Sequence, residues 1–207
     1  MKNDLPVYEL IVEPHAFGAP KKALHVLYEE SQSPGDKCIA AWTIEYGALN
    51  RVVTLWERPS GDCLTSGEPT ASIDWLSPAR IGWRLESQVA PRMELLNAPF
   101  LDLRMYGIKP GQKDGILPAF VENLPARERY SMCAGMWSAR ERDQELMIHL
   151  WPYESFDQRI AVREKTFKDP EWLQYLMKAA NAFSHLQAMQ MIPLALPNTQ
   201  SAKEDRS

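Results

Sequence analysis

A histidine within an apolar, strand-like run is the residue of this sequence whose type and position most favour chemistry. His149 lies in the run MIHLW, residues 147–151. Side chains along a strand alternate between two faces, so His149 shares a face with Trp151, while Ile148 and Leu150 occupy the other. A purely aliphatic face suits packing under helices. We therefore expect His149 to face the interior of a barrel, beside Trp151.

Several roles are open to a histidine in this position. Imidazole titrates near neutral pH, so His149 could be a catalytic general base or a hydrogen-bond donor to a substrate. It could also ligate a haem iron, although no carboxylate or second histidine lies nearby at a metal-ligand spacing. The alternative is a structural histidine that is hydrogen-bonded in the core. We expect no metal and no cofactor, with haem as a minor possibility.

Two arginines four residues apart are candidate substrate-binding residues. Arg159 and Arg163 would lie on one face of a helix and could bind a carboxylate or a phosphate. Alternatively they pair with neighbouring acids such as Asp157, Glu164 or Asp169 and stabilise the helix.

Aromatic residues on the predicted strands are further candidates for substrate binding. Such side chains could line an apolar ligand cavity, or they could fill a core that needs no ligand. They are Trp42, Trp56, Trp137, Trp151, Tyr106 and Tyr130. Thr54 joins them as a candidate, because it occupies in the first half of the chain the position that His149 occupies in the second.

The composition excludes several classes of protein. The chain has 207 residues, of which 45% are hydrophobic and 24% charged, so we expect a folded globular protein. Its net charge of −4 argues against a nucleic-acid partner. Three cysteines without a CxxC spacing predict neither a disulfide framework nor a zinc site. We see no signal peptide and no run long enough to span a bilayer, and expect a soluble cytoplasmic protein without a membrane partner.

The chain repeats itself. Residues 37–56 align without a gap with residues 132–151, so that Trp42 coincides with Trp137 and Trp56 with Trp151. Tryptophan is rare, so the two tryptophan coincidences are the main evidence for an internal repeat. We predict an N-terminal repeat of residues 5–93, which is the degenerate one, and a C-terminal repeat of residues 97–195. A flexible polar tail, residues 196–207, would follow.

Both halves show one pattern of elements. Strand-like alternation covers residues 7–13, 37–46, 50–57 and 81–90, and then 100–107, 129–139, 145–151 and 186–193. Helices are predicted at residues 19–31 and 111–124. Two more are predicted to begin at a capping box at Ser155 and at an N-cap at Asp169. Each half therefore has a βαββαβ, ferredoxin-like pattern. The fold class is α+β, with two tandem repeats that pair their bare sheet faces into a dimeric α+β barrel-like core.

The second half resembles the NIPSNAP family of the dimeric α+β barrel superfamily. The matching segments are YGIKPG (106–111), HLW (149–151), Tyr153, Arg159, Arg163, DPEW (169–172) and Gln187; in the first half they are Tyr8-Glu9-Leu10 and GALNRVVTLW (47–56). Thr54 stands where the family usually has histidine. The resemblance implies the barrel fold. It also implies a choice of activities: the wider superfamily holds cofactor-free oxygenases, isomerases, dehydratases and some haem proteins, whereas animal relatives are linked to mitochondria and vesicle traffic as interaction proteins.

Two hypotheses for function follow. In the first, the barrel interior binds or converts a small hydrophobic metabolite, with His149 as general base or hydrogen-bond donor and Trp151 and Tyr106 as walls. In the second, the chain is a non-catalytic interaction or oligomerising module, with residues 58–69 as a docking loop. A homodimer is expected because edge strands and a helix face remain free.

Overall fold

The computed structural model describes residues 7–30, 34–59 and 80–197. The first half contains β1 (Val7–Pro14), α1 (Pro20–Glu30), β2 (Lys37–Tyr46), β3 (Arg51–Arg58) and β4 (Ile81–Val89). A short 3-10 turn, η1 (Met93–Leu95), leads into the second half. The second half contains β5 (Phe100–Ile108), α2 (Lys113–Glu128), β6 (Gly135–Glu141), β7 (Gln144–Tyr153), α3 (Phe156–Thr166), α4 (Pro170–Ala179) and β8 (Phe183–Pro193). The docking loop proposed at residues 58–69 falls mainly outside the described residues.

The strands close into one antiparallel barrel in the order β1-β3-β2-β8-β5-β7-β6-β4. Within this order each half has the strand sequence of a ferredoxin-like sheet, β4-β1-β3-β2 in the first and β8-β5-β7-β6 in the second. The two sheets join where β2 pairs with β8 and where β4 pairs with β6. The predicted α+β fold, with tandem ferredoxin-like sheets forming a barrel, is confirmed.

The interior of the barrel is filled with apolar side chains. Residues at alternate strand positions, such as Leu103 on β5 and Ile148 and Leu150 on β7, form its buried core. Trp42, Trp83 and Trp137 lie in the same core. Each of these three indole rings is at most 1% exposed. Close packing of this kind accounts for the interior without a ligand.

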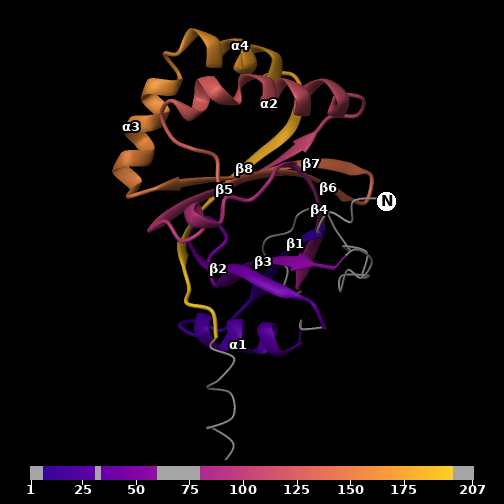
Figure 1. Ribbon diagram of the computed structural model, residues 1–207, viewed down its shortest axis with the longest axis vertical. Coiled ribbons are helices and arrows are strands. Elements are labelled where there is room, and N and C mark those ends of the chain that lie inside the picture. The colour runs from indigo at the N-terminus through magenta and orange to yellow at the C-terminus, as the bar shows by residue number, and fades with distance from the viewer. Residues whose placement is uncertain (1–6, 31–33, 60–79, 198–207) are drawn as a thin grey trace, which may run out of the picture.

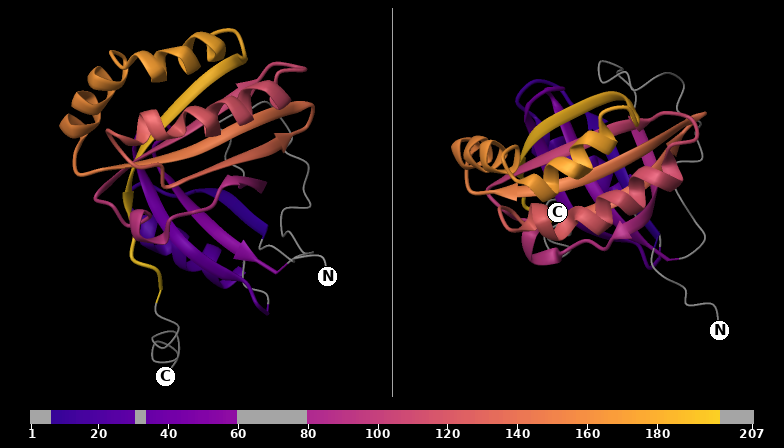
Figure 2. Two further views of the ribbon diagram at one scale, coloured as in Figure 1. Left: turned by 45° about the horizontal axis from the view of Figure 1, so that its top comes forward. Right: turned by 90° about the horizontal axis from the view of Figure 1, so that it is seen from above.

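Helices cover the outer faces of the sheets. Figure 1 shows α2, α3 and α4 over the second half and α1 on the opposite side, over the first. In the view from above, α2 and α4 run side by side across the strands (Figure 2). Between these helices and the second sheet lies a second apolar core, which includes Met147 and Trp151 of β7.

The predicted helix caps are present. The Ser155 side chain accepts a hydrogen bond from the Gln158 backbone N–H at the start of α3. Asp169 caps α4 by accepting from the backbone N–H groups of Glu171 and Trp172, and Pro170 occupies the first turn.

The start of one strand was predicted wrongly. We expected a strand over residues 129–139, but β6 begins at Gly135 because α2 continues to Glu128. Arg129 and Tyr130 resemble the start of an alternating strand. Their side chains instead reach the carboxylate of Asp169 at 2.6 and 2.9 Å, and so tie the end of α2 to the start of α4.

Candidate functional site

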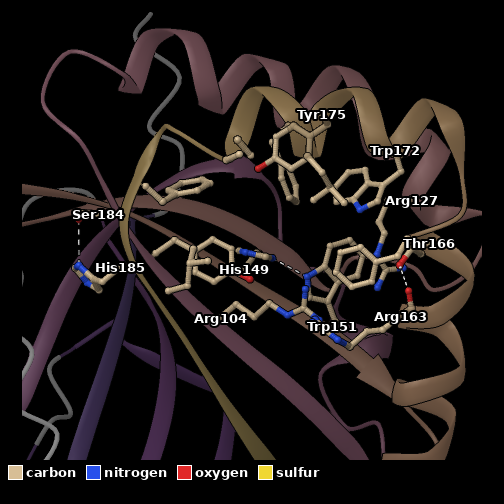
Figure 3. A pocket seen from close by; sticks show the side chains of 18 residues that line it. Arg104, Arg127, His149, Trp151, Arg163, Thr166, Trp172, Tyr175, Ser184 and His185 are labelled. Atoms are coloured by element: carbon tan, nitrogen blue, oxygen red, sulfur yellow. Dashed lines mark hydrogen bonds between the residues drawn. The ribbon is translucent and has the colours of Figure 1, made fainter.

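A pocket of about 530 Å³ lies between the outer face of the second sheet and its covering helices. This volume is in the range of small-molecule sites. β5, β7 and β8 form its floor, and α2, α3 and α4 form its walls (Figure 3). Its lining includes Arg104, Tyr106, Phe120, Arg127, His149, Trp151, Arg163, Phe167, Trp172, Tyr175, Ala180 and Leu186. Phe167, Ala180 and Leu186 are exposed and mark where the pocket meets solvent.

His149 faces this pocket and not the interior of the barrel, so the predicted orientation of β7 is wrong. The two faces were separated correctly, because Ile148 and Leu150 point one way and His149 and Trp151 the other. The helices, however, cover the face that carries the histidine. The aliphatic face instead packs against the other sheet in the closed barrel.

His149 is held in one tautomer. The indole Nε1–H of Trp151 donates to its Nδ1 at 2.6 Å. An indole N–H can only donate, so Nδ1 carries no hydrogen, and in the neutral ring the hydrogen lies on Nε2. Burial, with an added contribution from Arg104, holds the pKa of His149 well below its ordinary value. At neutral pH the ring is therefore an uncharged hydrogen-bond donor through Nε2.

The donor of His149 has no partner among the described residues. Nε2 is buried and makes no hydrogen bond in this part of the chain. The ring is surrounded by aromatic edges: the Tyr106 and Phe120 ring centroids lie 5.0 and 5.3 Å away. A buried donor without a partner costs about 1–3 kcal/mol, so an acceptor at this position would be stabilising.

Arg104 lies opposite His149 in the pairing of β5 with β7. Its guanidinium donates to the carboxylate of Asp102 at 2.8 and 2.9 Å. Arg159 of α3 and Gln190 of β8 donate to the same carboxylate, each at 2.8 Å. Burial alone would raise the pKa of Asp102, but these donors outweigh it and lower that pKa. Asp102 is therefore a buried carboxylate anion.

Two more arginines reach the pocket without an acidic partner. Arg127 of α2 lies over the Trp151 ring, 4.1 Å from its centroid, and donates to the Tyr153 hydroxyl at 3.0 Å. Arg163 of α3 is half-buried against the Phe167 ring. Burial, and then repulsion from Arg104, lower the pKa of Arg163. The pKa of Arg127 is also lowered, because burial and repulsion from Arg104 outweigh the attraction of Tyr153. Neither arginine forms an ion pair with any described residue.

Aromatic side chains form the wall opposite the sheet. The Phe120 ring of α2 lies edge-on to Trp172 and Tyr175 of α4, at centroid distances of 5.9 and 5.4 Å. Trp172 and Tyr175 lie against each other at 4.7 Å. These contacts give the pocket a rigid apolar side that faces the polar groups of β5 and β7.

The structure brings together only some of the predicted site residues. His149, Trp151, Tyr106 and Arg163 line the pocket. Arg159, one helical turn from Arg163, pairs with Asp102 instead.

The other candidates lie elsewhere. Trp42 and Trp137 belong to the barrel core. Trp56 lies under α1 in the first half and donates to the hydroxyl of Thr54 at 2.9 Å. Thr54 lies on the outer face of the first sheet, so it does not share a site with His149.

Sequence reasoning missed Arg104, Arg127, Phe120, Trp172 and Tyr175 as pocket residues. For Arg104 the sequence does contain an indication. Asp102, Arg104 and Tyr106 alternate with apolar residues, which predicts that these three side chains share one face of a strand. No comparable signal marks Arg127, which reaches the pocket only through the position of α2.

The equivalent outer face of the first half is closed in the described part of the chain. Ile11 pairs with Thr54 just as Arg104 pairs with His149, so an isoleucine replaces the pocket arginine. Tyr28 of α1 lies 5.8 Å from the Trp56 ring. Leu196, which follows β8, packs there as well.

Charge is also balanced in the first half. Arg58 lies over Trp56 and pairs with Glu9 at 2.8 Å and with Asp36. The two halves differ here, because Arg127 lies over the Trp151 ring without an acidic partner among the described residues.

No group of three potential metal ligands is found among the described residues. In the same part of the chain, no helix has both the length and the apolar character needed to cross a membrane.

Comparisons with known proteins agree with this architecture. The NIPSNAP family model matches residues 101–197, which carry the pocket. Protein NipSnap homolog of Dictyostelium discoideum is 24% identical over 176 residues, which cover 80% of this chain and 78% of that protein. Protein NipSnap homolog 3B of Mus musculus is 28% identical over 129 residues, covering 62% of this chain and 51% of that protein.

The fold of the whole chain also has a solved counterpart. The crystal structure of an anthrone oxidase-like protein superposes with a TM-score of 0.66, covers 93% of both chains and is 10% identical in sequence. At that identity the likeness concerns the fold alone. The family model and the two curated relatives show that the second half of this chain, residues 101–197, is similar to the NIPSNAP family.

Proposed function

We propose that the protein binds a small molecule with an aromatic or otherwise apolar body in the pocket between the second sheet and helices α2, α3 and α4. The observation that supports this most directly is the buried Nε2–H of His149, which has no partner among the described residues and lies in a pocket walled by aromatic rings. A polar group of the ligand would accept this hydrogen bond, and its apolar body would pack on Phe120 and Tyr175.

His149 acts as a hydrogen-bond donor in this proposal. With Nδ1 occupied by the Trp151 N–H, neither ring nitrogen offers a free lone pair at neutral pH. The general-base role would require the other tautomer, in which the hydrogen bond from Trp151 is lost. The same donor would stabilise negative charge that develops on a ligand oxygen, which is the contribution His149 would make to a reaction.

Blocking the pocket tests the proposal. Ala180 lines the pocket at its exposed end, so Ala180→Trp places an indole ring in the space for the ligand. Met177 is in the last turn of α4, which Ala180 caps, but it is 77% exposed and does not line the pocket, so Met177→Trp is the matched control. Binding of 2-naphthoate and of its neutral analogue 2-naphthamide is measured by saturation-transfer difference NMR.

We expect at least one of these two probes to bind the wild-type chain and Met177→Trp, and to lose its signal with Ala180→Trp. Probe binding that is as strong in Ala180→Trp as in the wild type would contradict the proposed site. So would the absence of binding by both probes to the wild-type chain.

A further inference from the structure

The pocket holds an excess of positive charge. Four arginines gather at or beside it: Arg104, Arg127, Arg159 and Arg163. Among the described residues the only carboxylate that pairs with any of them is that of Asp102, which is bonded to Arg104 and Arg159. No aspartate or glutamate lines the pocket in this part of the chain. At least two positive charges therefore face the pocket without a counter-charge.

The arginines act on one another across the pocket. Burial is the main cause of the lowered pKa values of both Arg127 and Arg163, and repulsion from Arg104 lowers them further. In Figure 3 their side chains converge around Trp151 and His149 from β5, α2 and α3. Arg104 and Arg127 are only 8% and 2% exposed, so water screens this repulsion weakly. Buried charge without a partner is costly, and an anion in the pocket would relieve that cost.

The polar groups at the sheet end of the pocket are mainly donors. Guanidinium groups donate and cannot accept, and the neutral His149 ring donates through Nε2. The aromatic rings of Phe120, Trp172 and Tyr175 lie on the opposite side. The lining thus combines an anion-binding end with an apolar end.

From this arrangement we infer that the ligand of the pocket is an organic anion, whose single carboxylate or phosphate group binds among Arg104, Arg127, Arg163 and the Nε2–H of His149 while its flat apolar body lies on the aromatic wall. This inference rests on the proposed function and adds the chemical class of the ligand. Arginine forks match the two oxygens of a carboxylate or a phosphate, and such charge-assisted hydrogen bonds are the strong ones.

The inference is tested by isothermal titration calorimetry of the full chain with 2-naphthoate, 2-naphthamide and 2-naphthyl phosphate. The amide has nearly the shape of the carboxylate but no charge. We expect at least one of the two anions to bind the wild-type chain about 10- to 100-fold more tightly than the amide, the ratio for one or two charge-assisted hydrogen bonds. The tighter of the two anions identifies the head group.

Two variants of α3 locate the anion. Arg163→Gln removes a charge that lines the pocket, and Lys165→Gln removes the same charge from an exposed position on the same helix. Arg163→Gln should weaken anion binding at least about 10-fold and leave amide binding unchanged. Lys165→Gln should change neither.

The failures can be told apart. If 2-naphthamide binds as tightly as both anions, or if Arg163→Gln leaves anion binding intact, the anion inference is overturned while the pocket remains a ligand site. If no probe binds, or if Ala180→Trp does not affect binding, the proposed function fails and the inference fails with it.

Discussion

At the scale of single residues, the hydrogen bond between Trp151 and His149 determines what the pocket offers to a ligand. The alternation of MIHLW was enough to predict which residues share a face. It could not show which face points at the helices, because Met147 and Trp151 are as apolar as Ile148 and Leu150. The side chains that distinguish the two faces, Arg104 and Arg127, come from other elements and meet His149 only in the folded chain.

The low pKa of His149 makes stability depend on pH. The folded pKa lies well below the ordinary value of about 6.5, which applies to the unfolded chain. Below pH 6.5 the unfolded chain therefore binds a proton that the folded chain does not, and the free energy of unfolding falls as pH drops. The slope from this residue is at most about 1.4 kcal/mol per pH unit.

His149→Asn isolates this contribution. The asparagine amide oxygen can replace Nδ1 as the acceptor for Trp151, but the side chain does not titrate. Urea unfolding at pH 7.0 and at pH 5.5 should show a smaller loss of stability in the variant than in the wild-type chain. Equal losses in the two proteins would mean that His149 is not held neutral in the folded state.

At the scale of elements, α3 and α4 are held by different interactions although both starts were predicted from their caps. α4 buries Trp172, Tyr175 and Ala179 in the second apolar core. α3 buries only Val162 and Thr166. It is linked to the sheet by the ion pair of Arg159 with Asp102, and at its first turn by the ring of Phe156, which lies against Phe100 of β5. The sequence predicted Arg159 and Arg163 on one helical face but gave no sign that one would pair with the sheet and the other would line the pocket.

Arg159→Gln should therefore loosen α3 selectively. Loss of one buried charge-assisted hydrogen bond costs about 1.5–3 kcal/mol, and Arg104 remains to pair with Asp102. Hydrogen–deuterium exchange should show amides of α3 exchanging about 10- to 100-fold faster, with α4 unchanged. Faster exchange of both helices, or of neither, would show that the Arg159–Asp102 pair is not what holds α3 in place.

At the scale of the whole molecule, one chain contains two copies of a sheet. Among the described residues, a pocket lies over the second copy, whereas packed side chains cover the equivalent face of the first. The tryptophan coincidences within residues 37–56 and 132–151 were enough to predict two matching sheets and the barrel. The difference between the copies depends on contacts over long distances in the sequence. Leu196 follows the second half yet packs on the first, where Glu9 and Asp36 neutralise Arg58. No local pattern reports such contacts.

The most direct test of this account is a ¹H–¹⁵N spectrum of the tryptophan indole groups during titration with 2-naphthoate, with signals assigned by single Trp→Phe variants. Trp151 and Trp172 line the pocket, whereas Trp42 and Trp137 are enclosed in the barrel core. The account predicts that the Nε1–H signals of Trp151 and Trp172 shift while those of Trp42 and Trp137 stay in place. Shifts of Trp42 and Trp137 with Trp151 unmoved would contradict it and place the ligand inside the barrel.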